Sequence, residues 1–387
     1  MLNNNNASIY IHWPFCVSKC PYCDFNSHVS KNSLKLLTWQ KAYQREIDRE
    51  AEKTGKKYIT SIFFGGGTPS LMHNSLIEFL LNHIEKKWTI APNAEITLEA
   101  NPSSAEMQKF KTLSKLGINR LSLGLQSLND NSLNFLGRSH NAKEGLDALE
   151  YAKKYFNRVS FDLIYGLPNQ TEKIWEAELL KAISFSGEHI SAYQLTIEKG
   201  TPFNQQYKNK TFKLPSEKIL LNLYTITEEI LNKNNFLKYE VSNFSKNNAI
   251  SVHNTNIWKG NEYFGFGPGA HGRTIVKNKW HASQRYPSPS VWLDKTSNYN
   301  NSFLKHENIT GVQRAKEILL TGLRLTNGIN LSEIKKLCKI NNFENIIDKN
   351  FSHVLIKENF ININDNLISV TKKGFPVLNS IIKKLII

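Results

Sequence analysis

The stretch SIYIHWPFCVSKCPYCDF, residues 8–25, decides how the rest of this chain is organised. It begins as a short apolar strand and continues into Cys16, Cys20 and Cys23, which form a C-x3-C-x2-C array. The chain has 4 cysteines in all, and random placement would rarely bring three of them so close together. Three thiolates at this spacing can wrap one soft metal centre from a single loop.

Two kinds of metal site use three local thiolates. A structural zinc site needs a fourth ligand, which His12 or His28 could supply. A [4Fe–4S] cluster can be held by three cysteines, with one iron left open to an outside ligand. The array has no second C-x2-C or H-x3-H half, which argues against zinc. We therefore expect an iron–sulfur cluster with one open iron.

Short β-rich runs alternate with longer helical patterns from Ser8 to about Ile197. The predicted strands are 8–13, 59–64, 94–99, 120–125, 158–164 and 189–195. The predicted helices are 34–53, 75–88, 105–116, 142–155 and 173–185, and the last three carry apolar residues at i, i+3/i+4 spacing. Six βα units in a row predict an α/β fold with a parallel sheet, either a barrel or a doubly wound sheet.

Polar or glycine-rich residues follow all six strands, which favours the barrel. They are the cysteine loop, GGGTPS at 65–70, EANP at 99–102, Gln126-Ser127, Asp162 with YGLP at 165–168, and Gln194. Ordinary turns also favour Gly, Asn and Pro, but in a (β/α) barrel the carboxyl ends of the strands form the catalytic face. The three glycines 65–67 offer amide donors to a carboxylate, Glu99 and Asp162 can hold amino or hydroxyl groups, and Arg138 can pair with a carboxylate. We predict a partial, TIM-like (β/α)6 barrel with a cofactor site at this end.

The pattern changes after Pro202, and we divide the chain into a barrel (1–240), a connecting region (241–305) and a C-terminal domain (306–387). A helix near 215–234 and a strand at 239–244 lead to the irregular stretch 253–272, and 285–302 resembles a linker or surface loop. Helices at 311–325, 331–339 and 351–358, a hairpin across 360–370 and a final helix then outline a winged-helix-like α+β domain. No helix in it carries base-reading Arg or Asn, so DNA binding is disfavoured.

The net charge of +16 suits an anionic partner, but the lysines are scattered among many asparagines. Dispersed charge of this kind indicates a solvated surface rather than a nucleic-acid footprint. No run of about 18 apolar residues predicts a membrane-spanning helix, so any membrane contact would be peripheral. The polar start MLNNNNAS does not resemble a secretory signal, and we expect a cytoplasmic protein.

The cysteine array resembles the signature of the radical S-adenosylmethionine (SAM) superfamily. The segments YIHWPFCVSKCPYCDF, FFGGGTPS, TLEANPS, RLSLGLQS, LGRSH and DLIYGLP are similar to its oxygen-independent coproporphyrinogen III oxidase-like family, which includes the heme chaperones HemW. The match runs from about Tyr10 to Gly272. It implies a radical SAM barrel, a [4Fe–4S] cluster, bound SAM and an electron donor that the sequence does not identify.

Residue by residue, the resemblance implies that Cys16, Cys20 and Cys23 ligate the cluster and that SAM chelates the fourth iron. The positions that match SAM contacts are Tyr10, Gly66 and Glu99. The positions that match the rest of the cavity, where the dehydrogenase of this family binds a second SAM, are Tyr22, Gly67, Thr68, Gln126, Arg138 and Asp162.

Two positions separate the branches of this family. The dehydrogenase has a fourth cysteine two residues after the third, where this chain has Phe25, and this argues against dehydrogenase activity. The heme chaperone branch carries H-N-x-x-Y-W, matched here by His253 to Trp258 with Ile257 in place of tyrosine. His253 could ligate heme iron, or could only hydrogen-bond backbone within a loop. The leading hypothesis is a chaperone that binds heme or a porphyrin and passes it to an acceptor protein; the alternative is coproporphyrinogen III dehydrogenase.

Overall fold

The computed structural model describes residues 5–29 and 35–387. Its main sheet has the strand order β14-β13-β12-β11-β1-β4-β5-β6-β7-β8-β10-β9. Six consecutive strands of this sheet run parallel to one another: β1 (Asn6–Trp13), β4 (Tyr58–Gly66), β5 (Thr89–Ala100), β6 (Arg120–Gln126), β7 (Arg158–Tyr165) and β8 (His189–Gln194). All six predicted strands and the α/β class are therefore confirmed. The sheet is mixed, with antiparallel strands at both ends.

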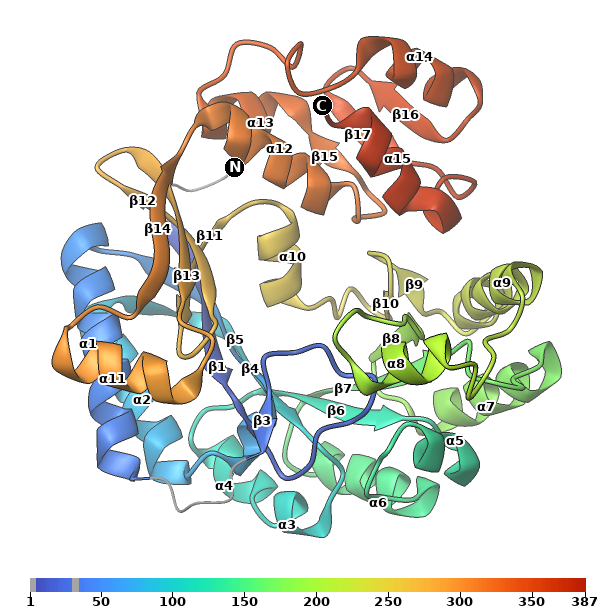
Figure 1. Cartoon of the computed structure of the whole chain (residues 1–387), viewed down its shortest axis with the longest axis horizontal. Helices are drawn as coiled ribbons and strands as arrows, with labels where there is room; N and C mark the ends of the chain where they lie inside the picture. Colours follow the sequence, from blue (N-terminus) through green and yellow to red (C-terminus); the bar gives the residue numbers. More distant parts are fainter. Residues whose placement is uncertain (1–4, 30–34) are drawn as a thin grey trace.

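Helices cover the outer face of these strands (Figure 1). They are α1 (Leu36–Thr54), α2 (Asn74–Lys87), α3 (Ser104–Met107), α4 (Phe110–Lys115), α5 (Asp130–Phe135), α6 (Ala142–Lys153), α7 (Glu172–Phe185) and α9 (Glu217–Lys233). Helix α8 (Pro202–Lys208) instead packs beside the cysteine loop, where the ring of Phe203 lies 6.3 Å from that of Tyr22. The predicted helix 105–116 is wrong in detail, because it is split into α3 and α4. The predicted start of the first helix at Leu34 lies outside the described residues.

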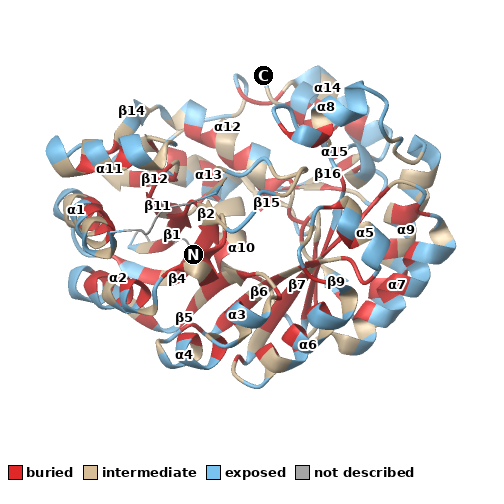
Figure 2. Ribbon diagram, turned by 60° about the horizontal axis from the view of Figure 1, so that its bottom comes forward, coloured by how far each residue is buried: buried red, intermediate tan, exposed pale blue. Residues whose placement is uncertain are grey.

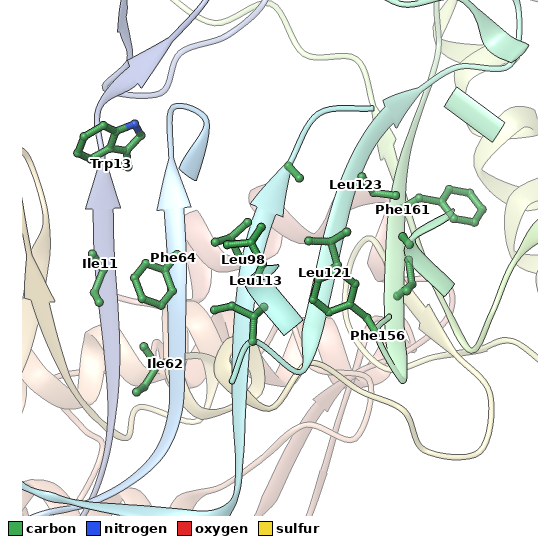
Figure 3. Packing of buried hydrophobic residues seen from close by; sticks show 14 of the residues in the cluster. Ile11, Trp13, Ile62, Phe64, Leu98, Leu113, Leu121, Leu123, Phe156 and Phe161 are labelled. Carbon is green, nitrogen blue, oxygen red and sulfur yellow. The ribbon is translucent and has the colours of Figure 1, made fainter. Parts of the chain in front are cut away.

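The main core lies between the strands and these helices. Alternate residues of the strands, among them Ile11, Phe64, Leu98 and Leu121, point to this one layer (Figure 3). Figure 2 shows the strands buried, and the helices buried on their inner faces but exposed outside. The other strand residues face the interior of the barrel, where many are polar, including Ser8, Ser61, Thr97 and Ser160. A polar interior prepares the barrel to receive charged groups.

The region predicted as a connection contributes to the main sheet. Strand β11 (Glu262–Phe266) pairs in parallel with β1, and β12 (His271–Val276), β13 (Lys279–Arg285) and β14 (Phe303–Ile309) extend the sheet as an antiparallel ribbon. The predicted loop 285–302 is wrong, because it contains helix α11 (Pro289–Asn298). Ser288 caps this helix, and the buried Trp292 packs on Trp39 with ring centroids 5.2 Å apart. The irregular stretch begins with a helix, α10 (Val252–Trp258), and the predicted strand 239–244 is replaced by the short β9 (Leu237–Lys238) and β10 (Asn243–Ser245).

The C-terminal part has its own core and a small sheet, β15-β17-β16. Its elements are α12 (Gly311–Gly322), β15 (Ile329–Asn330), α13 (Leu331–Cys338), α14 (Lys349–Lys357), β16 (Ile361–Asn364), β17 (Leu367–Val370) and α15 (Leu378–Leu385). Three helices followed by a hairpin and a last helix is the predicted order. The domain limits at 240 and 305 stay a prediction. The main sheet continues across both, because β9 and β10 lie on either side of the first and β14 spans the second. In the described part of the chain, no helix is both long and apolar enough to span a bilayer.

Candidate cofactor site

The cysteine loop closes on itself directly after β1. Strand β2 (Phe15–Cys16) pairs with β3 (His28–Val29), and the amide of Cys23 donates to the carbonyl oxygen of Cys20 at 3.1 Å. The loop borders a cavity of about 360 Å³ at the carboxyl ends of the strands. The predicted site residues that line this cavity are Cys16, Cys20, Tyr22, Cys23, Gly66, Gly67, Thr68, Glu99, Gln126, Arg138 and Asp162. Residues at the ends of β4, β5, β6 and β7 thus surround the three thiols.

Polar donors face the sulfur atoms. The hydroxyl of Thr68 donates to Cys16 Sγ at 3.3 Å, and Arg138 Nη1 donates to Cys20 Sγ at 3.4 Å. Burial raises the pKa of the Cys16 and Cys23 thiols, so they need a nearby positive charge to become thiolates. No three His, Cys, Asp or Glu side chains of the described chain converge as they would on one metal ion. A cubane cluster has a different requirement, since each of its cysteines binds a different iron.

Glycine is required where the strand β4 ends. Gly66 has φ +114°, and an added Cβ would lie 2.5 Å from the ring of His12. An added Cβ on Gly67 would lie 2.8 Å from the carbonyl oxygen of Phe15. The Gly66 amide also donates to Glu99 Oε2 at 3.2 Å. Backbone can therefore approach a ligand closely here, as a cofactor cradle needs.

Two carboxyl groups and one guanidinium face the same cavity. Burial, reinforced by Asp162, raises the pKa of Glu99 to about 8, and burial raises the pKa of Asp162 to about 6. A bound cation would relieve both effects. Arg138 donates to the carbonyl oxygen of Gly124 at 2.9 Å, while its Nε is buried without a hydrogen-bond partner among the described residues. The cavity therefore offers acceptors for an amino group and a guanidinium charge for a carboxylate.

The comparisons with known proteins agree with this geometry. The Radical SAM superfamily pattern matches residues 10–182. The chain is 35% identical to the heme chaperone HemW of Buchnera aphidicola over 97% of both chains. It is 33% identical to the zebrafish radical S-adenosyl methionine domain-containing protein 1, mitochondrial, over 98% of this chain and 87% of that one. The chain belongs to the HemW family of radical SAM proteins. Coproporphyrinogen III oxidase (HemN) from Escherichia coli, a radical SAM enzyme, has the same fold, with a TM-score of 0.82 at 21% identity over 98% of this chain and 89% of that one.

Membership of the radical SAM superfamily implies a [4Fe–4S] cluster and SAM, and the residues present fit both. The thiols of the loop suit the cluster. The guanidinium of Arg138 and the carboxyl of Glu99, which both line the cavity, suit the amino acid part of SAM. Gln126 has φ +73°, a strained conformation for a non-glycine residue, where it enters this cavity. Other residues that line the cofactor cavity were not predicted from the sequence as ligand contacts: Ser122, Tyr193, Leu195, Thr196 and Glu198. Only their position near the strand ends could have indicated them.

Two of the predicted site residues of this HemW family chain do not line the cavity. The hydroxyl of Tyr10 and Nδ1 of His12 are hydrogen-bonded at 2.9 Å, and the Tyr10 ring lies 6.4 Å from that of His253. His253 is 2% exposed and its Nδ1 lies 3.0 Å from the Ser61 hydroxyl, in the first half of β4 and away from the cysteines. Its Nε2 is buried without a partner among the described residues, and burial lowers its pKa to about 4.

Proposed function

We propose that this protein is a heme chaperone, which binds heme and transfers it to an acceptor protein, and which carries a [4Fe–4S] cluster with exchangeable SAM. The observation that carries the proposal is Phe25. It lines the cofactor cavity at the position where the dehydrogenase branch has a fourth cysteine, and its side chain is 58% exposed. An exposed phenyl ring supplies no cluster ligand, but suits contact with an apolar partner. The name heme chaperone HemW, carried by relatives such as those of Buchnera and Haemophilus influenzae, supports the same proposal.

In this proposal the chain's own residues hold and shield the cofactors. Cys16, Cys20 and Cys23 hold the cluster, and Arg138 and Glu99 orient SAM by its carboxylate and amino groups. When bound, the pair supplies one-electron chemistry at the open iron. Heme ligation by His253 stays a prediction that requires α10 to move, because the imidazole is buried.

The test uses the full chain, purified without oxygen and with its cluster intact. Heme is titrated and followed by its Soret absorption, and the loaded protein is then mixed with apomyoglobin as a model acceptor. We expect stoichiometric binding and transfer of heme; protein that neither retains nor passes on heme is not a chaperone. A parallel incubation with coproporphyrinogen III, SAM and a reductant should yield no protoporphyrinogen, and its formation would establish the dehydrogenase alternative.

A further inference from the structure

A second cavity is lined by residues of the β12–β14 ribbon and of helix α13. Figure 1 shows where these elements lie in the fold. Its volume is about 620 Å³, well within the range of about 300–1,000 Å³ that accepts compact organic ligands. The lining residues that matter below are Ile275, Lys279, Trp280, Ile309, Lys336 and Leu337. They come from β12, β13, β14 and α13, so the cavity exists only in the folded chain.

Hydrogen bonds and stacking hold the walls of this cavity in place. The indole Nε1 of Trp280 donates to the carbonyl oxygen of Leu337 at 3.2 Å, which fastens the ribbon to α13. The guanidinium of Arg314 lies 4.6 Å from the centroid of the Trp280 ring, and Trp280 is only 6% exposed. The site is therefore formed before any ligand arrives, which lowers the entropic cost of binding.

The lining divides by chemistry into an apolar interior and a cationic rim. Ile275, Trp280, Ile309 and Leu337 provide apolar and aromatic surface. The exposed lysines at positions 279, 336 and 339 surround it, opposed by a single acid, Glu333. A complementary ligand has a broad apolar body and carboxylates on one edge.

We propose that this cavity binds the porphyrin ring of heme, with its two propionates at the lysine rim. This inference rests on the proposed heme chaperone function and assigns a binding site to the heme that the chaperone would carry. The cofactor cavity, at about 360 Å³, also has to accommodate SAM, which leaves less room there for a tetrapyrrole. Unlike ligation by His253, binding here needs no movement of α10. Because recognition uses the ring and the carboxylates, metal-free protoporphyrin IX binds as heme does.

The position of this second cavity also separates the bound porphyrin from the iron–sulfur cluster. Asn26 of the cysteine loop donates to the carbonyl oxygen of Pro287, just beyond the end of β13, whereas Lys279 and Trp280 begin that strand. A strand of this length spans about 20 Å. Heme binding is therefore independent of the cluster.

The experiment titrates heme and metal-free protoporphyrin IX into the full chain with its cluster intact. Lys279→Glu combined with Lys336→Glu reverses two exposed rim charges, and Asn308→Trp fills the cavity from the edge strand β14. The matched control, Lys357→Glu with Lys383→Glu, makes the same charge change on exposed residues of the C-terminal part that do not line the cavity. We expect both cavity variants to weaken the binding of both ligands by about tenfold or more, and the charge control to bind them as the natural chain does.

The outcomes distinguish this inference from the chaperone function. If the natural chain binds heme and both cavity variants bind it equally well, the site is wrong and the function stands. If the natural chain binds heme but not protoporphyrin IX, recognition by ring and carboxylates is wrong. If the natural chain binds neither, the proposed function itself fails.

Discussion

The ring of His12 joins the barrel to the cysteine loop: its Nε2 lies 2.9 Å from the carbonyl oxygen of Asn26. Burial lowers the pKa of His12 to about 4, so the neutral ring bridges Tyr10 on one side and Asn26 on the other. The Asn26 amide in turn donates to the carbonyl oxygens of Pro268 (3.0 Å) and Pro287 (2.9 Å). The loop that carries the cysteines is thus tied to β1 and to the segments that follow β11 and β13.

Replacing Asn26 with alanine should loosen this loop. Three side-chain hydrogen bonds are lost, to Pro268, Pro287 and His28, and we expect the free energy of unfolding to fall by about 1–3 kcal/mol. Iron content after reconstitution should fall as well. Asn131→Ala, an exposed change in α5, is the control for both measurements. Unchanged iron content and stability would show that the tether does not position the loop.

Gly66→Ala tests the cofactor cradle, with Gly117→Ala as a matched control. Both glycines have φ above +100°, but an added Cβ at Gly117 meets nothing within 4 Å. The control therefore carries only backbone strain, about 1–2 kcal/mol. Gly66→Ala adds a clash with His12 and should lower the melting temperature further and weaken SAM binding. Equal effects of the two changes would contradict the close approach at Gly66.

Cys16→Ala should remove the cluster's visible absorption completely and leave heme affinity unchanged within about twofold, because the second cavity lies about 20 Å away. Absorption spectra and heme titration of one preparation provide both readouts. Loss of heme binding along with the cluster would place the two ligands in one site.

Glu99 makes SAM binding depend on pH. Its pKa is raised to about 8 without ligand, so the carboxyl is largely neutral at pH 6 and ionises as the pH rises to about 8. The ionised form attracts the SAM amino group, and SAM affinity should rise over this window. Glu99→Gln should weaken SAM binding about tenfold and flatten the profile, as measured by calorimetry. Because the pKa of Glu99 is raised in the folded chain, its ionisation destabilises the ligand-free fold as the pH rises from about 4.5 to about 8. Glu99→Gln should remove part of this loss of stability.

His253 makes the fold sensitive to acid. Burial lowers its pKa from 6.5 to about 4, so its contribution to stability is present above pH 6.5 and is lost as the pH falls toward 4. His253→Phe should reduce this loss, while the broken bond to Ser61 costs about 1–2 kcal/mol at neutral pH. Urea unfolding between pH 4 and 7 measures both effects; an unchanged slope would mean that α10 already exposes the imidazole.

Much of the cofactor site could be predicted from sequence, because its signals are local. The spacing of Cys16, Cys20 and Cys23 limits them to one loop. Parallel strands bring residues near their carboxyl ends, such as Glu99 and Asp162, to one edge of the sheet. Helix α11 was missed because Pro289 and its neighbouring serines favour turns, whereas burial of Trp292 against Trp39 stabilises a helix. At this segment, tertiary packing overrides the local preference of the residues for turns.

The sequence by itself determined the order of the six strands along the chain and the cysteine array. It also determined that position 25, next but one after Cys23, is a phenylalanine and not a cysteine. Only the tertiary structure decided that His253 is buried against Ser61, and that Trp280 and Leu337 meet to wall a cavity. Both depend on contacts between residues far apart in the chain, such as Ser61 with His253. Periodicity and spacing report which face of an element is apolar, but not which distant element covers it.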